Sequence, residues 1–175
     1  MIDELKNIEY VLFDLDGTVS DSSEGITKSA DKALKSEGIN VPFETLTSFI
    51  GPALRVSFGR YTDDVEKRDR MLDVYRERYS EKGWCENKIY PGMAELLRDL
   101  QKSGRHVVLA SAKPEYFCRK IIKYFGVEQY FDFIGGSDME GKRDDKTVLL
   151  TYVLDNIDNP PSDKIVMIGD RRFDV

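Results

Sequence analysis

Two aspartates, Asp14 and Asp16, follow a short apolar run and are the first residues whose types and spacing could do chemistry. The run spans residues 8–13 and is rich in β-branched and aromatic side chains, which favours a buried strand. Carboxylates at the end of such a strand are costly unless something needs them there. Two of them can hold a hard cation, and one can attack an electrophile. The same residues, with Gly17, also occur as simple turn caps, so the rest of the chain must decide.

Three later apolar runs predict further strands, over residues 106–110, 130–134 and 164–168. In a parallel sheet the carboxyl ends of all strands lie at one edge, so the residues that follow them converge. The groups brought together would be Asp14, Asp16, Ser111, Asp170 and Asp174, with Lys113, Lys142 and Lys146 nearby. Phosphoryl transfer needs such a set, namely a nucleophile, a cation held by acids, and positive or N–H donors around the phosphoryl oxygens. Each residue alone also has an ordinary structural reading, such as a helix cap, a turn or a solvated lysine.

Helical patterns separate these strands. Between residues 19 and 87 the periodicity predicts only helices. The first begins at an Asp21–Glu24 capping box and ends at Gly38. Two short helices over 42–50 and 54–61 follow, and then a longer one that begins at Val65 and ends before Gly83. Further helices follow Pro91-Gly92, Pro114 at a first helical position, and the polar loop before Val148. The alternation predicts an α/β fold with a parallel sheet, built from core residues 1–18, a helical insertion over 19–87, and core residues 88–175.

Composition limits the class of partner. The 175 residues carry a net charge of −6, which argues against a nucleic-acid polymer or an anionic membrane. No apolar run approaches the roughly 20 residues that cross a bilayer, and acidic residues interrupt the amino terminus where a signal pattern would stand. The two cysteines form no framework or metal spacing, so we expect a cytoplasmic protein.

The order of the motifs resembles the haloacid dehalogenase-like (HAD) superfamily. DLDGT stands at 14–18, Ser111 ends the second strand, a lysine follows downstream, and GDRRFD stands at 169–174. The helical insertion is similar to that family's C1-type cap. The stretches VLFDLDGTVSDSSEGI, FIGPAL and MIGDRRFDV are most similar to its phosphoglycolate phosphatase-like branch. The resemblance covers essentially the whole chain and implies a Rossmann-like parallel-sheet core with an inserted all-α cap domain.

The resemblance implies a role for each motif residue. Asp14 would be the nucleophile that forms an aspartyl-phosphate, and Asp16 the general acid and then the general base. Ser111 would hydrogen-bond the phosphoryl group. Asp170 and Asp174 would hold Mg²⁺ together with Asp14 and the backbone carbonyl of Asp16. An aspartate at position 16 favours phosphatase or phosphomutase chemistry over dehalogenation, because a leaving alkoxide needs a proton.

Other positions are implied with less support from the pattern. Lys146 is our choice for the phosphate-binding lysine from its place in the motif order, with Lys142 as the alternative. The substrate would be contacted by Gly17, Thr18, Ala112, Lys113 and Arg55. Arg55 follows the rigid Gly51-Pro52 pair and could clamp an anion, or it could lie on a solvated helix face.

These observations predict a Mg²⁺-dependent phosphatase of small phosphomonoesters, such as phosphoglycolate or a nucleotide, that acts as a monomer or homodimer. A phosphomutase of the β-phosphoglucomutase type shares the same motifs and remains an alternative. A phospho-aspartate signalling module is a second alternative, although it has no need of Asp16 as an acid. The family continues beyond the position of Val175 with a helix, a strand and a closing helix. We therefore expect the C-terminal part of the core to be missing from this chain, which would leave the fourth strand at an edge or one sheet face uncovered.

Overall fold

The computed structural model describes residues 4–138, 142–143 and 145–171 and divides into two compact units. The α/β unit comprises residues 1–20 and 89–175, and the helical unit comprises residues 21–88. The chain passes between them through two short strands that pair with each other, β2 (Ser20–Asp21) and β3 (Lys88–Ile89). In the part of the chain that the structure describes, no helix is long and apolar enough to cross a membrane.

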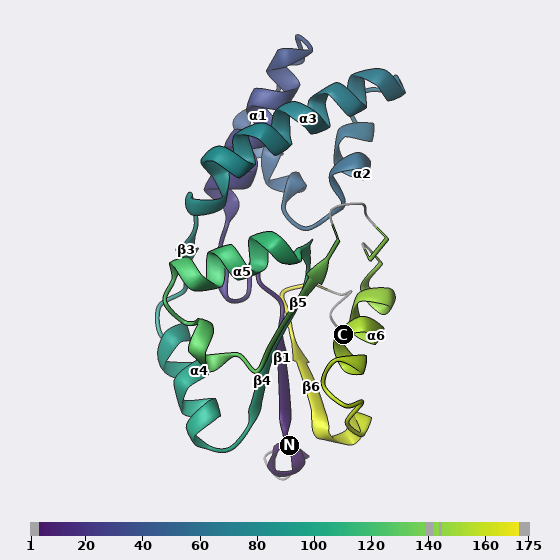
Figure 1. Ribbon diagram of the computed structural model, residues 1–175. Helices are drawn as coiled ribbons and strands as arrows, with labels where there is room; N and C mark the ends of the chain where they lie inside the picture. Colours follow the sequence, from purple (N-terminus) through teal and green to yellow (C-terminus); the bar gives the residue numbers. More distant parts are fainter. Residues whose placement is uncertain (1–3, 139–141, 144, 172–175) are drawn as a thin grey trace. The chain divides into compact units, whose positions relative to one another are not determined.

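A four-stranded parallel sheet forms the centre of the α/β unit, in the order β5-β4-β1-β6 (Figure 1). Its strands are β1 (Tyr10–Phe13), β4 (His106–Pro114), β5 (Phe133–Ser137) and β6 (Ile165–Ile168). Phe13 at the end of β1 is in register with Leu109 on one side and with Ile168 on the other. The predicted α/β class with a parallel sheet is therefore confirmed, and the segments that follow β1 and β6 leave the sheet side by side.

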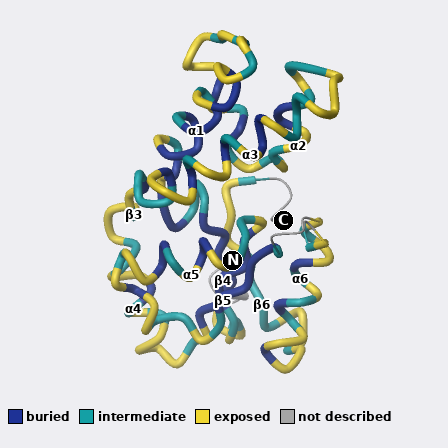
Figure 2. Tube along the Cα trace, turned by 45° about the horizontal axis from the view of Figure 1, so that its top comes forward, coloured by how far each residue is buried: buried dark blue, intermediate teal, exposed yellow. Residues whose placement is uncertain are grey.

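Three α-helices cover the sheet, namely α4 (Met93–Lys102), α5 (Glu115–Tyr124) and α6 (Lys146–Asp155). Leu12 and Val108 face α6, where they pack with Leu149 and Val153 in one buried cluster. Neighbouring residues in a strand point to opposite faces, so Val11 faces away from α6, towards α4. Figure 2 shows the result as a buried trace through the central strands. Burial on both faces explains the continuous apolar runs of the sequence.

Two strand boundaries differ from the sequence prediction. The second strand does not end on Ser111 but continues to Pro114, so Pro114 takes the N-cap position of α5 and not its first turn. The third strand runs over Phe133–Ser137, so the residues at 128–130 form a 3₁₀ turn and Gly135 and Gly136 lie inside the strand. Glycines are poor strand formers, and here close packing selects them: a β-carbon on Gly135 would lie 2.5 Å from Val153 of α6.

The helical unit contains three α-helices: α1 (Ser23–Ser36), α2 (Leu54–Gly59) and α3 (Val65–Glu81). The predicted helix at 42–50 is instead a 3₁₀ helix, η2 (Phe43–Phe49). The predicted Asp21–Glu24 capping box does not form, because α1 begins at Ser23 with Ser22 as N-cap. Asp21 accepts a hydrogen bond from the Ser23 backbone N–H instead (3.0 Å). Hydrogen bonding to the side chain of Ser23, and then to its backbone, lowers the pKa of the Asp21 carboxyl. α1 packs along α3, and a β-carbon on Gly25 would collide with the carbonyl of Gly83.

Among the described strands, β6 lies at one edge of the sheet. A hollow of about 300 Å³ lies between this strand and α4, on the face that Val11 occupies. Its walls are apolar, from Val166 and Ile168 of β6 and Leu96 and Leu100 of α4. This part of the sheet face is thus less covered than the α6 face.

Candidate active site

Asp14 and Lys146 form the first pair of charges at the carboxyl edge of the sheet. Asp14 directly follows β1, and its backbone N–H donates to the carbonyl of Ile168 at the end of β6 (2.9 Å). Lys146 is the first residue of α6 and places its ammonium 3.7 Å from Oδ1 of Asp14. The same ammonium donates to the carbonyl of Ala110 in β4 (3.0 Å). Asp14 is 8% exposed, so this is a largely desolvated pair held by three separate segments.

Asp16 and Lys113 form the second pair. The Lys113 ammonium lies 2.8 Å from Oδ2 of Asp16, and the two side chains are 7% and 13% exposed. The other oxygen of Asp16, Oδ1, is buried and has no hydrogen-bond partner among the described residues. The hydroxyl of Thr18 is in the same situation within residues 4–138, 142–143 and 145–171. The buried hydroxyl of Ser20 in the same loop also has no hydrogen-bond partner among the described residues. Buried polar atoms are normally hydrogen-bonded, so three such atoms in one loop indicate a place for a polar ligand.

The loop from Leu15 to Ser20 is a tight turn, and the side chain of Asp170 lies close to its Gly17. Gly17 has φ +87°, a left-handed conformation that disfavours side chains, and its N–H donates to the carbonyl of Ser20 (2.8 Å). A β-carbon at Gly17 would lie 2.5 Å from Oδ2 of Asp170. The carboxylate of Asp170 therefore rests against the backbone of this turn. The N–H of Gly17, one of the donors expected for a phosphate, is used within the turn itself.

The carboxylate and carbonyl oxygens at this edge of the sheet are ligands of the type that Mg²⁺ binds. Among the described residues no three His, Cys, Asp or Glu side chains gather as a metal cluster. Mg²⁺ does not need such a cluster, because it commonly takes one or two carboxylates, retained waters and substrate oxygens. Asp14, Asp170 and the carbonyl of Asp16 are hard oxygen donors of this kind, and the unpartnered Oδ1 of Asp16 marks polar space beside them. The fourth expected ligand, Asp174, lies outside the described residues.

Ser111 lies at the same edge, but in a strand interior. It is buried at 2% exposure, and its hydroxyl oxygen is 3.4 Å from the backbone N–H of Lys113. Ala112 is exposed next to it. The β4–β5 register shifts here, because Ser111 is opposite Gly136 whereas Pro114 is opposite Ser137. Ala112 and Lys113 therefore bulge out of the ladder, which changes the direction of their side chains.

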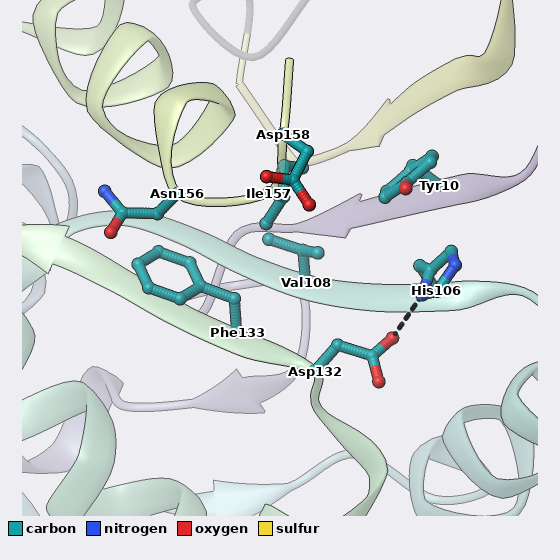
Figure 3. Close-up of a pocket in the computed structure, with 8 residues that line it drawn as sticks. All are labelled: Tyr10, His106, Val108, Asp132, Phe133, Asn156, Ile157 and Asp158. Carbon is teal, nitrogen blue, oxygen red and sulfur yellow. Dashed lines mark hydrogen bonds and ion pairs between the residues drawn. The ribbon is translucent and has the colours of Figure 1, made fainter. Parts of the chain in front are cut away.

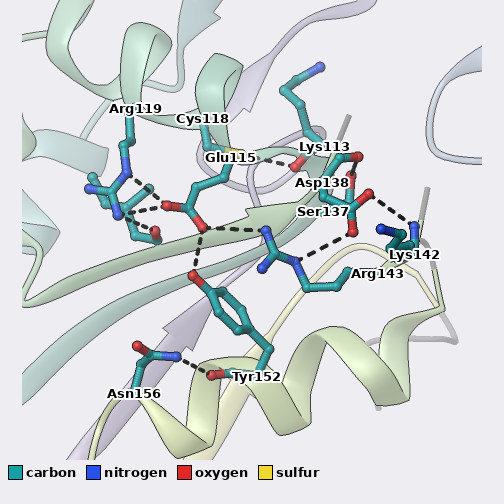
Figure 4. Close-up of polar contacts among 11 residues, drawn as sticks. Lys113, Glu115, Cys118, Arg119, Ser137, Asp138, Lys142, Arg143, Tyr152 and Asn156 are labelled. Atoms are coloured by element: carbon teal, nitrogen blue, oxygen red, sulfur yellow. Dashed lines mark hydrogen bonds and ion pairs between the residues drawn. The ribbon is translucent and has the colours of Figure 1, made fainter. Parts of the chain in front are cut away.

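The loop before α6 contains the alternative lysine. Lys142 is exposed, and its backbone N–H donates to the carboxylate of Asp138 (3.0 Å). Arg143 stacks on the ring of Tyr152, with its guanidinium carbon 4.0 Å from the ring centroid. The Tyr152 hydroxyl donates to Glu115 (3.1 Å), and burial together with this carboxylate raises the pKa of Tyr152 (Figure 4). This network was not predicted from the sequence. Arg143 and Tyr152 lie 28 and 37 positions after Glu115, and contacts over such separations give no local signal.

Arg55 lies in the helical unit and is considered there alone. Its guanidinium forms an ion pair with Asp69 of α3, and both side chains are largely exposed. Arg55 is thus a surface residue of the helical unit with an acidic neighbour that any anion would have to displace.

A separate pocket lies at the opposite ends of the strands and does not contain the expected chemistry. Figure 3 shows its lining, with His106 and Asp132 at one side and Asn156 and Asp158 at the other. His106 begins β4 at the surface, as its position in the sequence suggests, and its Nδ1 lies 3.0 Å from Oδ2 of Asp132. The same carboxylate oxygen accepts from the Val107 N–H (3.1 Å), so Asp132 has a structural role in joining two strands.

Comparison with known proteins identifies the family. A model of the haloacid dehalogenase-like hydrolases matches residues 11–175, so the chain belongs to this family. It is 36% identical over 168 residues to the tyrosine-protein kinase PtkA of Mycobacterium tuberculosis, covering 95% of this chain and 57% of PtkA. It is 38% identical over 167 residues to a 5′-nucleotidase of Pseudomonas aeruginosa, covering 94% of this chain and 75% of that protein. The chain thus spans little more than half the length of PtkA.

Solved structures agree with this family. A crystal structure described as a predicted phosphatase from Clostridium acetobutylicum superposes with a TM-score of 0.89 at 42% identity, covering 95% of this chain and 78% of that one. Relatives named phosphoglycolate phosphatase, such as that of Aquifex aeolicus at 29% identity over 96% of this chain and 78% of that protein, confirm the predicted branch.

Proposed function

We propose that this protein is a Mg²⁺-dependent phosphatase that hydrolyses small phosphomonoesters through an aspartyl-phosphate on Asp14. The observation that carries the proposal is the convergence of Asp14, Asp16, Lys113 and Lys146 at one sheet edge, as two buried ion pairs. Burial of unneeded charge is unfavourable, so two such pairs beside unpartnered polar atoms favour a reaction centre over a structural role. Membership of a hydrolase family and relatives named as phosphatases support the same reaction class.

We assign a role to each residue. Asp14 Oδ attacks phosphorus, and the bond to the leaving oxygen breaks as Asp16 donates a proton to that oxygen. Asp16 then accepts a proton from the water that hydrolyses the aspartyl-phosphate. Lys146 and the hydroxyl of Ser111 bind the phosphoryl oxygens.

Asp14, the Asp16 carbonyl, Asp170 and Asp174 would hold Mg²⁺, which when bound neutralises charge on the phosphoryl oxygens. Gly17, Thr18 and Ala112 contribute to the substrate site in the α/β unit. For Arg55 we propose an anion-binding role within the helical unit, in which an anion would take the place of Asp69. The cytoplasm is the proposed compartment, where the free cysteines Cys85 and Cys118 stay reduced.

The test is phosphate release from a panel of phosphomonoesters that includes phosphoglycolate, a nucleoside monophosphate and a hexose phosphate. We expect release that requires Mg²⁺, disappears with a chelator, and falls by about 10⁴-fold or more in Asp14→Asn, which lacks the nucleophile. Release by Asp14→Asn at the wild-type rate would overturn the proposal. The preferred substrate would show which kind of organic group the enzyme recognises.

A second candidate is phosphoryl transfer from Asp14 to a hydroxyl group in place of water. The relatives named tyrosine-protein kinase favour this candidate, and phosphomutases share the same motifs. Adding a tyrosine peptide or a sugar phosphate to the assay distinguishes the two. Transfer to the added hydroxyl at the expense of free phosphate would identify a transferase.

A further inference from the structure

The buried pair of Lys113 and Asp16 has a function of its own. The Lys113 ammonium lies 2.8 Å from Oδ2 of Asp16, and the two side chains are 7% and 13% exposed. We infer that Lys113 is a positioning residue, which holds Oδ2 of Asp16 so that Oδ1 is presented to the leaving group. The inference rests on the proposed function, since it assigns the residue that orients the acid of that reaction.

The two oxygens of Asp16 differ in a way that suits proton transfer. Oδ2 is held by Lys113, while Oδ1 is buried and lacks a hydrogen-bond partner among the described residues. A carboxylate that rotates freely would present either oxygen in many directions. Holding one oxygen restricts the other to a single direction, and a proton donor is effective only within hydrogen-bond reach of its target.

The backbone of β4 is built to deliver Lys113 to this position. The bulge at Ala112 and Lys113 puts two extra residues opposite the step from Gly136 to Ser137 in β5. Without the bulge, regular alternation would place Lys113 on the same face as Ser111 and Leu109. Bulges of this kind redirect single side chains next to functional sites.

The bulge is fixed by close backbone packing. A β-carbon on Gly136 would lie 2.7 Å from the carbonyl oxygen of Lys113 and 2.6 Å from the backbone nitrogen of Glu115. Backbone atoms cannot move aside cheaply, so only glycine allows this approach. The Lys113 carbonyl also accepts from the thiol of Cys118 (3.4 Å), whose pKa is raised by burial, so the thiol keeps its proton.

Glu115 anchors the other end of the segment. Its carboxylate accepts from Arg119 (2.9 Å) and from Tyr152 of α6 (3.1 Å), as Figure 4 shows. α6 begins with Lys146, and Lys146 itself donates to Ala110 of β4, so Glu115 adds a second link between the segment that carries Lys113 and the helix that carries Lys146. The positions of the two lysines are therefore coupled by the fold.

The experiment compares two esters that differ in their need for an acid. An alkyl phosphate expels a strongly basic alkoxide that must be protonated, whereas 4-nitrophenyl phosphate expels a phenolate that needs no proton. The parameter is kcat/KM, because it covers the steps up to departure of the leaving group. Wild type is compared with Lys113→Met, with Lys113→Arg as the conservative variant, and with Lys123→Met, which removes an exposed lysine of α5.

We expect Lys113→Met to lower kcat/KM for the alkyl ester about 100-fold and for the aryl ester less than about 3-fold. Lys113→Arg should restore part of the alkyl activity, and Lys123→Met should change neither ester. An equal loss on both esters would overturn the inference, because it would mean that Lys113 acts on the phosphoryl group itself. Wild type that turns over neither ester would overturn the proposed function.

A crystal structure of Lys113→Met decides the inference without catalysis. We expect the Asp16 carboxylate to leave its position while Asp14 keeps its own. An Asp16 carboxylate that stays in place would overturn the positioning role even in an active phosphatase.

Discussion

The α/β unit and the helical unit both pair basic with acidic side chains, but they do so in different environments. In the α/β unit, Lys113 and Asp16 are 7% and 13% exposed and meet at the edge where the strands end. In the helical unit, Arg55 and Asp69 are 64% and 50% exposed on the surface. An exposed pair contributes little to stability, whereas a buried pair is costly unless the charges are used. Burial therefore separates the charges to which we assign a role in the reaction from those that lie exposed at the surface.

The helical unit contains one exception. Arg78 and Glu86 are 15% and 10% exposed, with a closest distance of 2.8 Å, and Arg78 also donates to Ser29 of α1. This pair joins the end of α3 to the segment after η3 (Gly83–Cys85) and to α1. Glu86 does not follow the end of a sheet strand, and it belongs to none of the motifs that resemble the family. The comparison thus predicts different consequences for the two kinds of buried pair: loss of rate in the α/β unit and loss of stability in the helical unit.

Lys146→Met should give the largest effect. It removes the ammonium that faces Asp14, so charge on the transferring phosphoryl group is less stabilised, and kcat should fall by about 10²–10³-fold. Phosphate release at saturating substrate measures this. Lys142→Met is the matched variant from the neighbouring loop, and it should change kcat by less than about 3-fold. If Lys142→Met were the more damaged enzyme, the two lysines would exchange roles.

Arg78→Met should lower the free energy of unfolding by about 2–3 kcal/mol, because it leaves the carboxylate of Glu86 buried without its guanidinium. Chemical denaturation measures this. Where the protein is folded, kcat should stay within about 3-fold of wild type, since no reacting atom is touched. If Arg78→Met lowered kcat without lowering the free energy of unfolding, the buried pair of the helical unit would not have the purely structural role expected of it.

The same variant has a defined pH dependence. The guanidinium of Arg78 lowers the pKa of Glu86 below its usual 4.5, so the folded state binds a proton at lower pH than the unfolded chain does. The stabilisation is complete above the usual pKa and is lost as pH falls through the lowered one. The difference in unfolding free energy between wild type and Arg78→Met should therefore shrink between about pH 6 and pH 3. A constant difference over this range would contradict the account.

Gly136→Ala should lower the free energy of unfolding by about 1–3 kcal/mol, because the added methyl group meets the backbone of Lys113 and Glu115. The alkyl-ester kcat/KM should fall as well, since the bulge shifts. Gly59→Ala in α2 is the matched control. Its β-carbon would lie 3.4 Å from Arg68, an ordinary contact, and alanine favours a helix, so stability should hold or rise by up to about 1 kcal/mol. Equal destabilisation of both variants would show that close backbone approach is not specific to the bulge.

Arg55→Ala should have the smallest effect on stability, within about 0.5 kcal/mol, because its pair with Asp69 is exposed. If Arg55 binds a second anionic group of the substrate, KM for such a substrate should rise about tenfold with kcat unchanged. Asp69→Ala serves as the control, since it removes the same ion pair but leaves the arginine. A rise in KM in Asp69→Ala alone would assign the effect to the pair and not to the anion.

The strand ends and their acids could be predicted because their signals are local. A β-branched and aromatic run that stops on Asp14, or on Gly169-Asp170, identifies both the strand and the edge where ligands bind. In these cases a few adjacent residues carry the whole signal. Lys146 was chosen over Lys142 from its place in the motif order, which depends on the family resemblance and not on adjacent residues alone.

The geometry around Lys113 could not be predicted in the same way. A bulge depends on the register between two strands, and the strand over 133–137 was predicted three residues too early because Gly135 and Gly136 resemble a strand end. The double glycine was the available signal, since glycine inside a strand indicates close backbone approach. The contact of Tyr152 with Glu115 had no signal at all, because it depends on how α6 and α5 each pack against β4 and β5.

The most direct test of the central claim is to trap the phosphoryl group on the protein. A radiolabelled phosphomonoester is mixed with the enzyme, the reaction is quenched in acid within a single turnover, and the labelled peptide is mapped by mass spectrometry. We expect one acid-stable, base-labile acyl phosphate on Asp14, absent in Asp14→Asn. A phosphoryl group on another residue, or phosphate release with no labelled protein at any time, would contradict the claim.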